Sequence, residues 1–209
     1  MESIVRLFRI LANLRRIQVL RLLAVLGELS VTRLARATRV RLPRLSSHLG
    51  LLAATGLVWR RRSGRAVHYR LAERPGSPVT AAVLRELAAV FSAVRAGDPR
   101  RVARADQATS PVRSDAALFA CFTAFTHPRR LQIVRHLARR GPASLTELGR
   151  GLAIPPRACL RHLDKLERRG FVRRRVRGRK TVYLLAKGRG ALQRATLRVV
   201  VARLVGMGE

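Results

Sequence analysis

The chain has 209 residues, 48% of them hydrophobic, which is enough for one large domain or two small ones with cores of their own. Lysine and arginine number 44 against 11 acidic residues, for a formal net charge of +33. Pairing every carboxylate internally would still leave a large excess of cations, which favours a polyanionic partner. Arginines interrupt every apolar run well before the ~20 residues of a membrane span, so we expect no membrane partner.

The sequence contains an internal repeat. Adding 114 to each number aligns residues 8–72 with 122–186 without a gap, and 24 of the 65 aligned positions are identical. The match keeps register through two glycine turns and a tyrosine, which a shared arginine-rich composition would not produce. We therefore predict a tandem duplication, with a first domain at 1-96, a linker at 97-114 and a second domain at 115-209.

An amphipathic segment opens each copy. Residues 2–12 predict a short helix, and a similar segment at 117–130 favours that interpretation over an organellar transit peptide, which the arginine-rich start also resembles. Asn13 is expected to cap a second helix that ends at Gly27. Ser30 then caps a brief third helix, and its counterpart in the second copy, Ser144 to Glu147, has the pattern of a capping box.

The next segment predicts a helix followed by a hairpin. Leucines recur at helical spacing between Pro43 and Thr55, leaving a polar face beside an apolar one. Two alternating strands follow and reverse at Gly64, so each copy reads as a helix-turn-helix with a two-stranded wing. Tyr69 and Tyr183 are expected to pack the returning strand on the core. The predicted fold class is mainly α with small two-stranded β wings, in two winged helix-turn-helix domains.

The positions of the acidic residues along the chain decide whether the positive charge reflects a biased composition alone or a binding surface. Arginine heavily outnumbers lysine, as biased codon usage alone can produce. However, no acidic residue lies between Glu28 and Glu73, or between Glu167 and Glu209. These windows contain both wings and much of both reading helices, so we expect an asymmetric field with a cationic face.

A further helix is predicted after each wing. Ser77-Pro78 starts one whose stripe runs from Val79 to Val94, and a matching stripe runs from Leu192 to Leu204. Neither stripe can be covered within one small domain, so we expect association surfaces there. The 18 linker residues reach about 60 Å when extended, which lets the second copy dock beside the first.

The order of elements and several motifs resemble the ArsR family of winged-helix transcriptional regulators, over nearly all of each copy. The most specific pieces are FTHPRRLQIVRHLA, SSHLGLLAATGLV, GRAVHYRLA and GRKTVYLLA. The resemblance implies that first and last helices build a dimer that places two reading helices in successive major grooves, usually to repress a promoter until an effector binds. Here the two copies would form an intramolecular pseudo-dimer. Two chains associating into four heads, and hence further homodimerisation, stays open.

The resemblance also places base-reading positions at Leu42, Pro43, Ser46 and Ser47, and at Pro156, Arg157, Leu160 and Arg161. Leucine and proline cannot hydrogen-bond a base edge, whereas arginine can reach guanine O6 and N7; neutralisation of phosphate by these arginines is an equal alternative. For His48 and His162 we favour phosphate contact or helix packing over base reading. The predicted DNA-binding residues are Arg44, Ser46, Ser47, His48, Arg60, Arg61, Arg62, Arg65, Arg157, Arg161, His162, Arg173, Arg174, Arg175, Arg177, Arg179 and Lys180.

No cofactor is predicted. Relatives that sense metal carry Cys-x-Cys on the third helix or Asp and His on the last, and this sequence has neither. Cys121 and Cys159 align with apolar Leu7 and Leu45, so small core residues are favoured over thiol sensors, in a reduced cytoplasmic protein. Trp59 can stack on a base, but a core position is favoured.

Two functions remain from the sequence, and a third is not expected. The favoured one is a DNA-binding transcriptional regulator, taken as a repressor, that reads duplex DNA without a metal. The alternative is an architectural or nonspecific nucleic-acid-binding protein, suggested by the high charge and the few polar readers. An enzyme is not expected, because no paired carboxylates, nucleophile-base set or phosphate loop is present. The effector, the target sequence and the direction of regulation are not given by the sequence.

Overall fold

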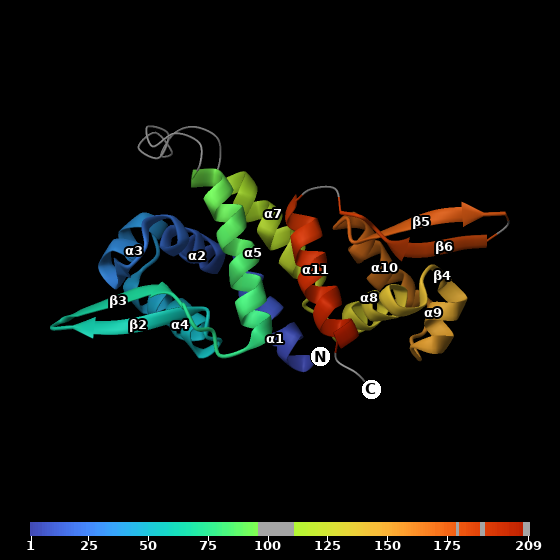
Figure 1. Ribbon diagram of the computed structural model, residues 1–209, viewed down its shortest axis with the longest axis horizontal. Coiled ribbons are helices and arrows are strands. Elements are labelled where there is room, and N and C mark those ends of the chain that lie inside the picture. The colour runs from blue at the N-terminus through green and yellow to red at the C-terminus, as the bar shows by residue number, and fades with distance from the viewer. Residues whose placement is uncertain (96–110, 179, 189–190, 207–209) are drawn as a thin grey trace. The chain divides into compact units, whose positions relative to one another are not determined.

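The structure is a computed structural model that describes residues 1–95, 111–178, 180–188 and 191–206 (Figure 1). The first copy contains α1 (Glu2–Leu11), α2 (Leu14–Leu26), β1 (Leu29–Ser30), α3 (Val31–Thr38), α4 (Leu42–Ala54), β2 (Val58–Ser63), β3 (Ala66–Leu71) and α5 (Pro78–Arg95). The second contains α7 (Pro111–Ala124), α8 (Pro128–Arg140), β4 (Ala143–Ser144), α9 (Leu145–Gly151), α10 (Pro156–Arg168), β5 (Val172–Arg177), β6 (Lys180–Leu185) and α11 (Ala191–Gly206). The predicted mainly helical fold with paired β wings is confirmed.

Each wing has one strand more than predicted. The strand orders are β1-β3-β2 and β4-β6-β5, all antiparallel, so a two-residue strand before the third helix adds to each hairpin. Tyr69 of β3 pairs with Leu29 of β1 and is buried, as its expected core role requires. Alternation of side chains gives no signal over two residues, which is why the sequence did not reveal these strands.

The local start and stop signals act as predicted. The Asn13 side chain accepts hydrogen bonds from the backbone N–H groups of Arg15 and Arg16 at the start of α2. Ser144 and Glu147 form a reciprocal capping box at α9. At the hairpin tips, Gly64 and Gly178 both have φ near 58°, the left-handed region that a two-residue turn with glycine first requires.

The turn before each reading helix has the same backbone in both copies. Arg39 and Ala153, which are 114 residues apart, take φ values of 52° and 50°. A non-glycine residue in this region costs on the order of 1 kcal/mol, so the packing of the flanking helices must hold the turn in place. This shared geometry aims α4 and α10 in the same way relative to α3 and α9.

The chain forms two compact units whose boundaries differ from those of the sequence copies. Met1–Arg9 and Ala120–Glu209 form the C-terminal unit, and Ile10–Phe119 form the N-terminal unit. Each unit therefore includes a helical segment from the other copy of the repeat. The ranges 1-96 and 115-209 stay a prediction about the repeat. Of the predicted linker, 97–110 lie outside the described residues and 111–114 begin α7.

An aromatic cluster forms the centre of the C-terminal unit. Phe8, from α1, lies 5.8 Å from Phe122 and 5.2 Å from Phe125 between ring centroids, and Phe125 lies 4.6 Å from Phe171. All four side chains are buried. The first ten residues of the chain thus supply part of the core on which the second reading helix rests.

A buried ion pair in the N-terminal unit joins residues from the two copies of the repeat. Asp115 of α7 accepts hydrogen bonds from the Arg21 guanidinium of α2, with Nε 3.0 Å from Oδ1. Burial raises the pKa of the Asp115 carboxyl, against the opposing effect of Arg21. In the same unit, α5 contacts α2, as α11 contacts α8 in the other.

Some arginines that the repeat preserves are structural. The Arg16 guanidinium donates to the carbonyl of Ile10, and its equivalent Arg130 donates to the carbonyl of Ala124, the equivalent of Ile10. Both bonds satisfy backbone oxygens at the end of the first helix of each copy. These half-buried cations therefore do not belong to the outer cationic surface. Among the described residues, no helix is both long and apolar enough to cross a membrane.

Candidate nucleic-acid interface

We call residues 31–71 the first head and residues 145–185 the second head, each a helix-turn-helix with its hairpin. The reading helix of the first head, α4, buries one face in its unit through Leu45, Leu49 and Leu52. Its other face is exposed and includes the predicted residues Arg44, Ser46 and Ser47. The helix presents few hydrogen-bonding groups for its length.

Two features of α4 reduce its polarity further. The Ser47 hydroxyl donates to the carbonyl of Pro43, at 3.2 Å, so its proton is used within the helix. Leu42 and Leu51 are 49% and 45% exposed, so part of the exposed face is apolar. The exposed surface of α4 is thus largely apolar.

The equivalent helix of the second head, α10, is more polar. It buries Cys159, Leu163 and Leu166, and exposes the predicted residues Arg157 and Arg161 one turn apart. Within the part of the chain that the structure describes, neither arginine makes a hydrogen bond or ion pair. Their guanidinium groups are therefore available to an external acceptor.

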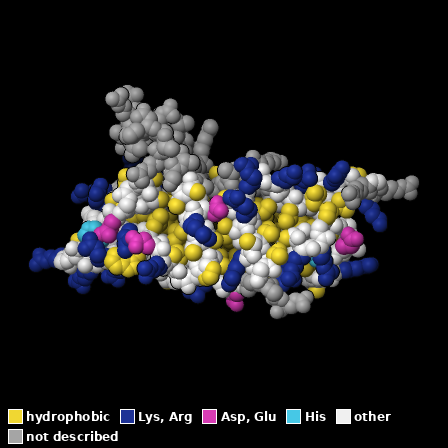
Figure 2. Space-filling model, viewed as in Figure 1, with side chains coloured by type: hydrophobic (Ala, Val, Ile, Leu, Met, Phe, Trp, Pro, Cys, Tyr) yellow, Lys and Arg dark blue, Asp and Glu magenta, His cyan; other side chains and the backbone are white. Residues whose placement is uncertain are grey.

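The first wing concentrates cations on an exposed hairpin. On β2 and its turn, Arg60, Arg61, Arg62 and Arg65 are all exposed. Arg61 forms an ion pair with Glu28, at 2.7 Å, and this hydrogen bond lowers the pKa of the Glu28 carboxyl. Figure 2 shows Lys and Arg side chains over this hairpin and at its tip.

The second wing repeats the pattern on β5 and β6. Its exposed cations among the described residues are Arg173, Arg174, Arg175 and Lys180. The Nε atom of Arg174 lies 3.6 Å from Oε1 of Glu167. The predicted residue Arg179 lies outside the described residues, and only the backbone of Arg177, in β5, is described. Adjacent cations on a strand point alternately to opposite faces, so the hairpin can contact phosphates on more than one side.

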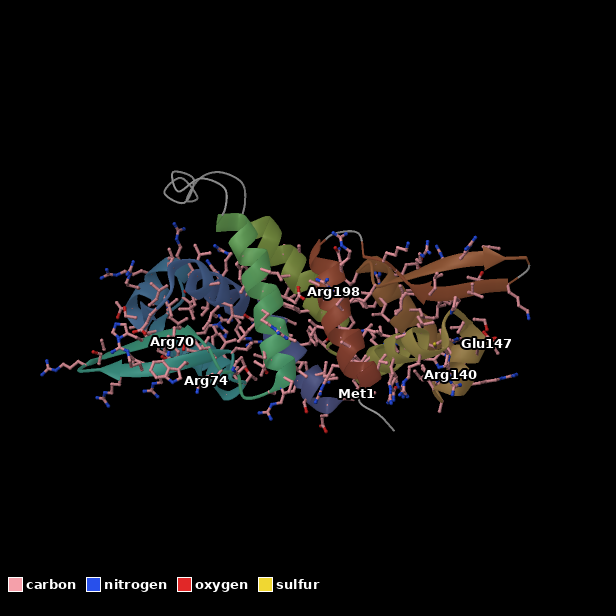
Figure 3. All side chains as sticks on the ribbon, viewed as in Figure 1. Met1, Arg70, Arg74, Arg140, Glu147 and Arg198 are labelled. Carbon is pink, nitrogen blue, oxygen red and sulfur yellow. The ribbon has the colours of Figure 1, made fainter. Side chains whose placement is uncertain are left out.

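Trp59 does not join the core. It is 43% exposed, and the guanidinium of Arg70, the residue labelled on this hairpin in Figure 3, lies 4.6 Å from the centroid of its ring. The core interpretation of Trp59 is therefore wrong, because its neighbour Val58 takes the buried side of β2 and the alternation of the strand puts Trp59 on the exposed side. The pairing of Trp59 with Arg70 was predictable from the turn, since a chain reversal at Gly64 and Arg65 places these two residues opposite each other on β2 and β3.

The two equivalent histidines have different surroundings. His48 is only 8% exposed and its Nε2 has no hydrogen-bond partner, which favours helix packing over contact with phosphate. His162 lies with its ring centroid 4.5 Å from that of His127, the N-cap of α8. Burial, together with His127 and nearby arginines, lowers the pKa of His162 to about 4. The lowered pKa of each histidine favours its neutral form in the free protein.

The cysteines behave as core residues. Cys121 and Cys159 are buried and free, and burial raises the pKa of both, that of Cys121 to about 11. A thiol that is protonated at neutral pH is a poor nucleophile and a poor metal ligand. Within the described residues, no group of three or more His, Cys, Asp or Glu side chains could hold a metal ion.

The described predicted residues fall into one set in each unit. The set from α4 and the β2–β3 hairpin lies in the N-terminal unit, and the set from α10 and the β5–β6 hairpin lies in the C-terminal unit. In each unit the reading helix contacts the first strand of its hairpin. A family model of helix-turn-helix domains matches residues 125–175, which span α8, α9, α10 and most of β5.

Residues 125–175 form a helix-turn-helix domain. The chain is 44% identical over 78 residues to the arsenical resistance operon repressor of Escherichia coli (strain K12), covering 37% of this chain and 65% of that protein. It is 42% identical over 72 residues to an HTH-type transcriptional regulator of Mycobacterium tuberculosis (strain ATCC 25618 / H37Rv), covering 34% and 31%. The chain thus spans less than two thirds of the length of either relative. No solved structure matches it significantly.

The match to a helix-turn-helix domain agrees with the order of elements that the sequence motifs indicated. The family model covers the second copy alone; for the first copy, the same order of helices and the same sheet topology in the structure give an equivalent unit.

Proposed function

We propose that this protein is a transcriptional repressor that binds duplex DNA with both heads and without a metal cofactor. In this proposal α4 and α10 enter the major groove and the two hairpins grip flanking phosphate or the minor groove. The observation that carries the proposal is the pair of exposed arginines on α10, one turn apart and without a partner among the described residues, on the second helix of a helix-turn-helix domain.

The contact between Phe8 and Phe122 supports an intramolecular pseudo-dimer. These residues are equivalents in the repeat, and their rings lie 5.8 Å apart in the C-terminal unit. Equivalent residues touch each other where a two-fold axis, or its approximate counterpart in a duplicated chain, passes between them. Such symmetry would present two heads to one face of DNA, about 34 Å apart, without a second chain.

The wings are proposed to supply most of the affinity. Protein contacts to DNA go largely to the backbone, and these contacts give no sequence preference by themselves. If about eight phosphates are contacted, log affinity should fall against log salt with a slope near −7. DNA as the partner would place the protein in the cytoplasm, with an effector of unknown identity.

Selection of bound duplexes from a random pool tests this function, followed by a footprint on the recovered sequence. We expect one protected site with two half-sites about one helical turn apart, and a preference over unrelated DNA of ~10³ or more at physiological salt. Recovery of unselected sequence, with tight binding that salt abolishes, would contradict the regulator.

That result would favour the second candidate, an architectural or nonspecific DNA-binding protein. The observation in its favour is the exposed face of α4, where Leu42, Pro43 and Leu51 cannot hydrogen-bond a base edge. Competition with unrelated DNA separates the two functions directly. A nonspecific protein is displaced from its labelled DNA by any unlabelled duplex, to an extent that depends only on the amount of competitor added.

A further inference from the structure

The two reading helices expose equivalent positions with opposite chemistry. In α4 the exposed positions 42, 43, 44, 46, 47, 50 and 51 hold Leu, Pro, Arg, Ser, Ser, Gly and Leu. In α10 the exposed equivalents 156, 157, 160 and 161 hold Pro, Arg, Leu and Arg, the half-buried positions 164 and 165 hold Asp and Lys, and the equivalent of Arg44, Ala158, is buried. The turns before the helices share a backbone conformation, and most of these positions face outward in both heads. The heads therefore share a scaffold but not a reading surface.

The surface of α10 fits guanine. Arg157 and Arg161 are four residues apart, so both side chains leave the same face of the helix. A guanidinium can donate two parallel hydrogen bonds to O6 and N7 of one guanine, which is the pattern that the major groove offers at G·C pairs. Their lack of internal partners means that no ion pair must break before they bind.

The surface of α4 fits thymine. Leu42 is 49% exposed in the first turn of the helix, the part that enters the major groove most deeply. An apolar side chain there gains by contact with the C5-methyl of thymine and offers guanine no donor. Ser47 adds little, since its hydroxyl donates to Pro43. The positions equivalent to Arg157 and Arg161 are a proline and a serine, so Arg44 is the one arginine on the exposed face of α4. Arg44 lies outside the positions that both heads expose, since its equivalent Ala158 is buried, and we assign it to phosphate.

We propose that the DNA site of this protein is not a palindrome: α10 selects a half-site with guanine, α4 selects a half-site with A·T pairs through thymine methyl groups while Arg44 contacts phosphate, and the protein binds in one orientation. The proposal rests on the proposed function and specifies its partner. It departs from the symmetric sites that two identical heads would select, because covalent duplication frees each head to change separately.

Exchange of one residue between the heads tests this proposal. Sequences are selected from a random duplex pool with the full-length wild type, with Arg161→Ser, which copies the first head, and with Ser47→Arg, which copies the second. The wild type should yield guanine in one half-site alone. Arg161→Ser should weaken binding to that sequence on the order of 10- to 100-fold and lose the guanine preference, while Ser47→Arg should introduce guanine into the other half-site.

Arg140→Ser is the matched control, because it removes one exposed cation from the last turn of α8, away from the reading helix (Figure 3). It should leave the selected sequence unchanged, and thermal melting checks that each variant is folded. A palindromic wild-type site with guanine in both halves would overturn the asymmetry while leaving a sequence-specific regulator. Absence of any selected sequence, despite salt-sensitive binding, would overturn the regulator as well.

Discussion

The two heads have the same fold but present different side chains on their exposed surfaces. They share strand order, hairpin turns and the left-handed residue before the reading helix. They differ at exposed positions, where α4 has hydroxyl and apolar groups beside the single arginine Arg44, and α10 has Arg157 and Arg161. Buried positions are constrained by close packing, whereas an exposed side chain can change with little effect on stability. Divergence has therefore collected on the surface that we propose contacts DNA.

The heads also differ in what supports them. The second head rests on an aromatic cluster that includes Phe8, a residue of the first copy, whereas the N-terminal unit takes Asp115 from the second copy. A change near the start of the chain should thus act on the head that is farther along the sequence. The following experiments test the comparison of the heads, beginning with the largest expected effect.

Phe8→Ala should destabilise the C-terminal unit by about 3–5 kcal/mol, the usual cost of removing a buried aromatic side chain. Hydrogen exchange should show the loss of protection in residues 120–206 rather than in 12–72. Leu14→Ala is the control, because Leu14 is exposed and its loss should cost about 0.5 kcal/mol or less. Loss of protection confined to the first head would contradict the division into units.

Removing Arg174 and Arg175 together should weaken binding to the selected site and to random DNA alike, and should reduce the salt slope by about 2. Arg161→Ala should instead weaken the selected site by about 1–3 kcal/mol and random DNA by much less. Fluorescence anisotropy at several salt concentrations measures both effects. Equal losses on the two DNAs in all variants would show that the helix and the wing do not have separate roles.

The second head should respond to acid through His162. The pKa of this histidine is lowered from 6.5 to about 4, so in that range the unfolded chain binds a proton that the folded chain excludes. Its contribution to stability is complete above about pH 6.5 and is lost as the pH falls toward 4. His162→Gln should flatten the fall in melting temperature between pH 7 and 4. An imidazole that titrates in NMR at or above pH 6.5 would contradict the burial effect.

Trp59 makes the first head visible by itself, since the chain has one tryptophan. Arg70→Ala should change its emission and cost about 0.5–1 kcal/mol, the range of an exposed cation–π contact. Addition of duplex DNA should quench Trp59 if the first wing contacts it. Emission that stays constant while anisotropy reports binding would mean that the first wing is not engaged.

Much of this molecule could be predicted from local sequence. The helix caps at Asn13 and Ser144, the turns at Gly64 and Gly178 and the burial of Tyr69 follow from signals within a few residues of each position. Because the two copies align without a gap, each prediction for one copy could also be made for the equivalent residues of the other. The exposed cations of the wings were predicted in the same way, although their contact with DNA stays a prediction.

Other features depended on residues that are distant in the chain. The cluster of Phe8 with Phe122 joins positions 114 apart, and the Arg21–Asp115 pair joins positions 94 apart. Local patterns give no information about such pairs, because burial and ion pairing are decided by which elements meet after folding. The same reason explains His48 and Trp59. The place of His48 at the edge of the helical surface predicts partial exposure, but its side chain is buried. The place of Trp59 at the start of a strand predicts a core residue, but its side chain is exposed.

The sequence by itself thus determined the number of modules, their elements and the sign of their charge, since each depends on composition or near neighbours. Tertiary structure alone decided which arginines hold backbone carbonyls, as Arg16 and Arg130 do, and which remain free to bind an anion, as Arg157 and Arg161 are. The physical reason is that a cation's role depends on its acceptors, and those acceptors are brought to it only by the fold.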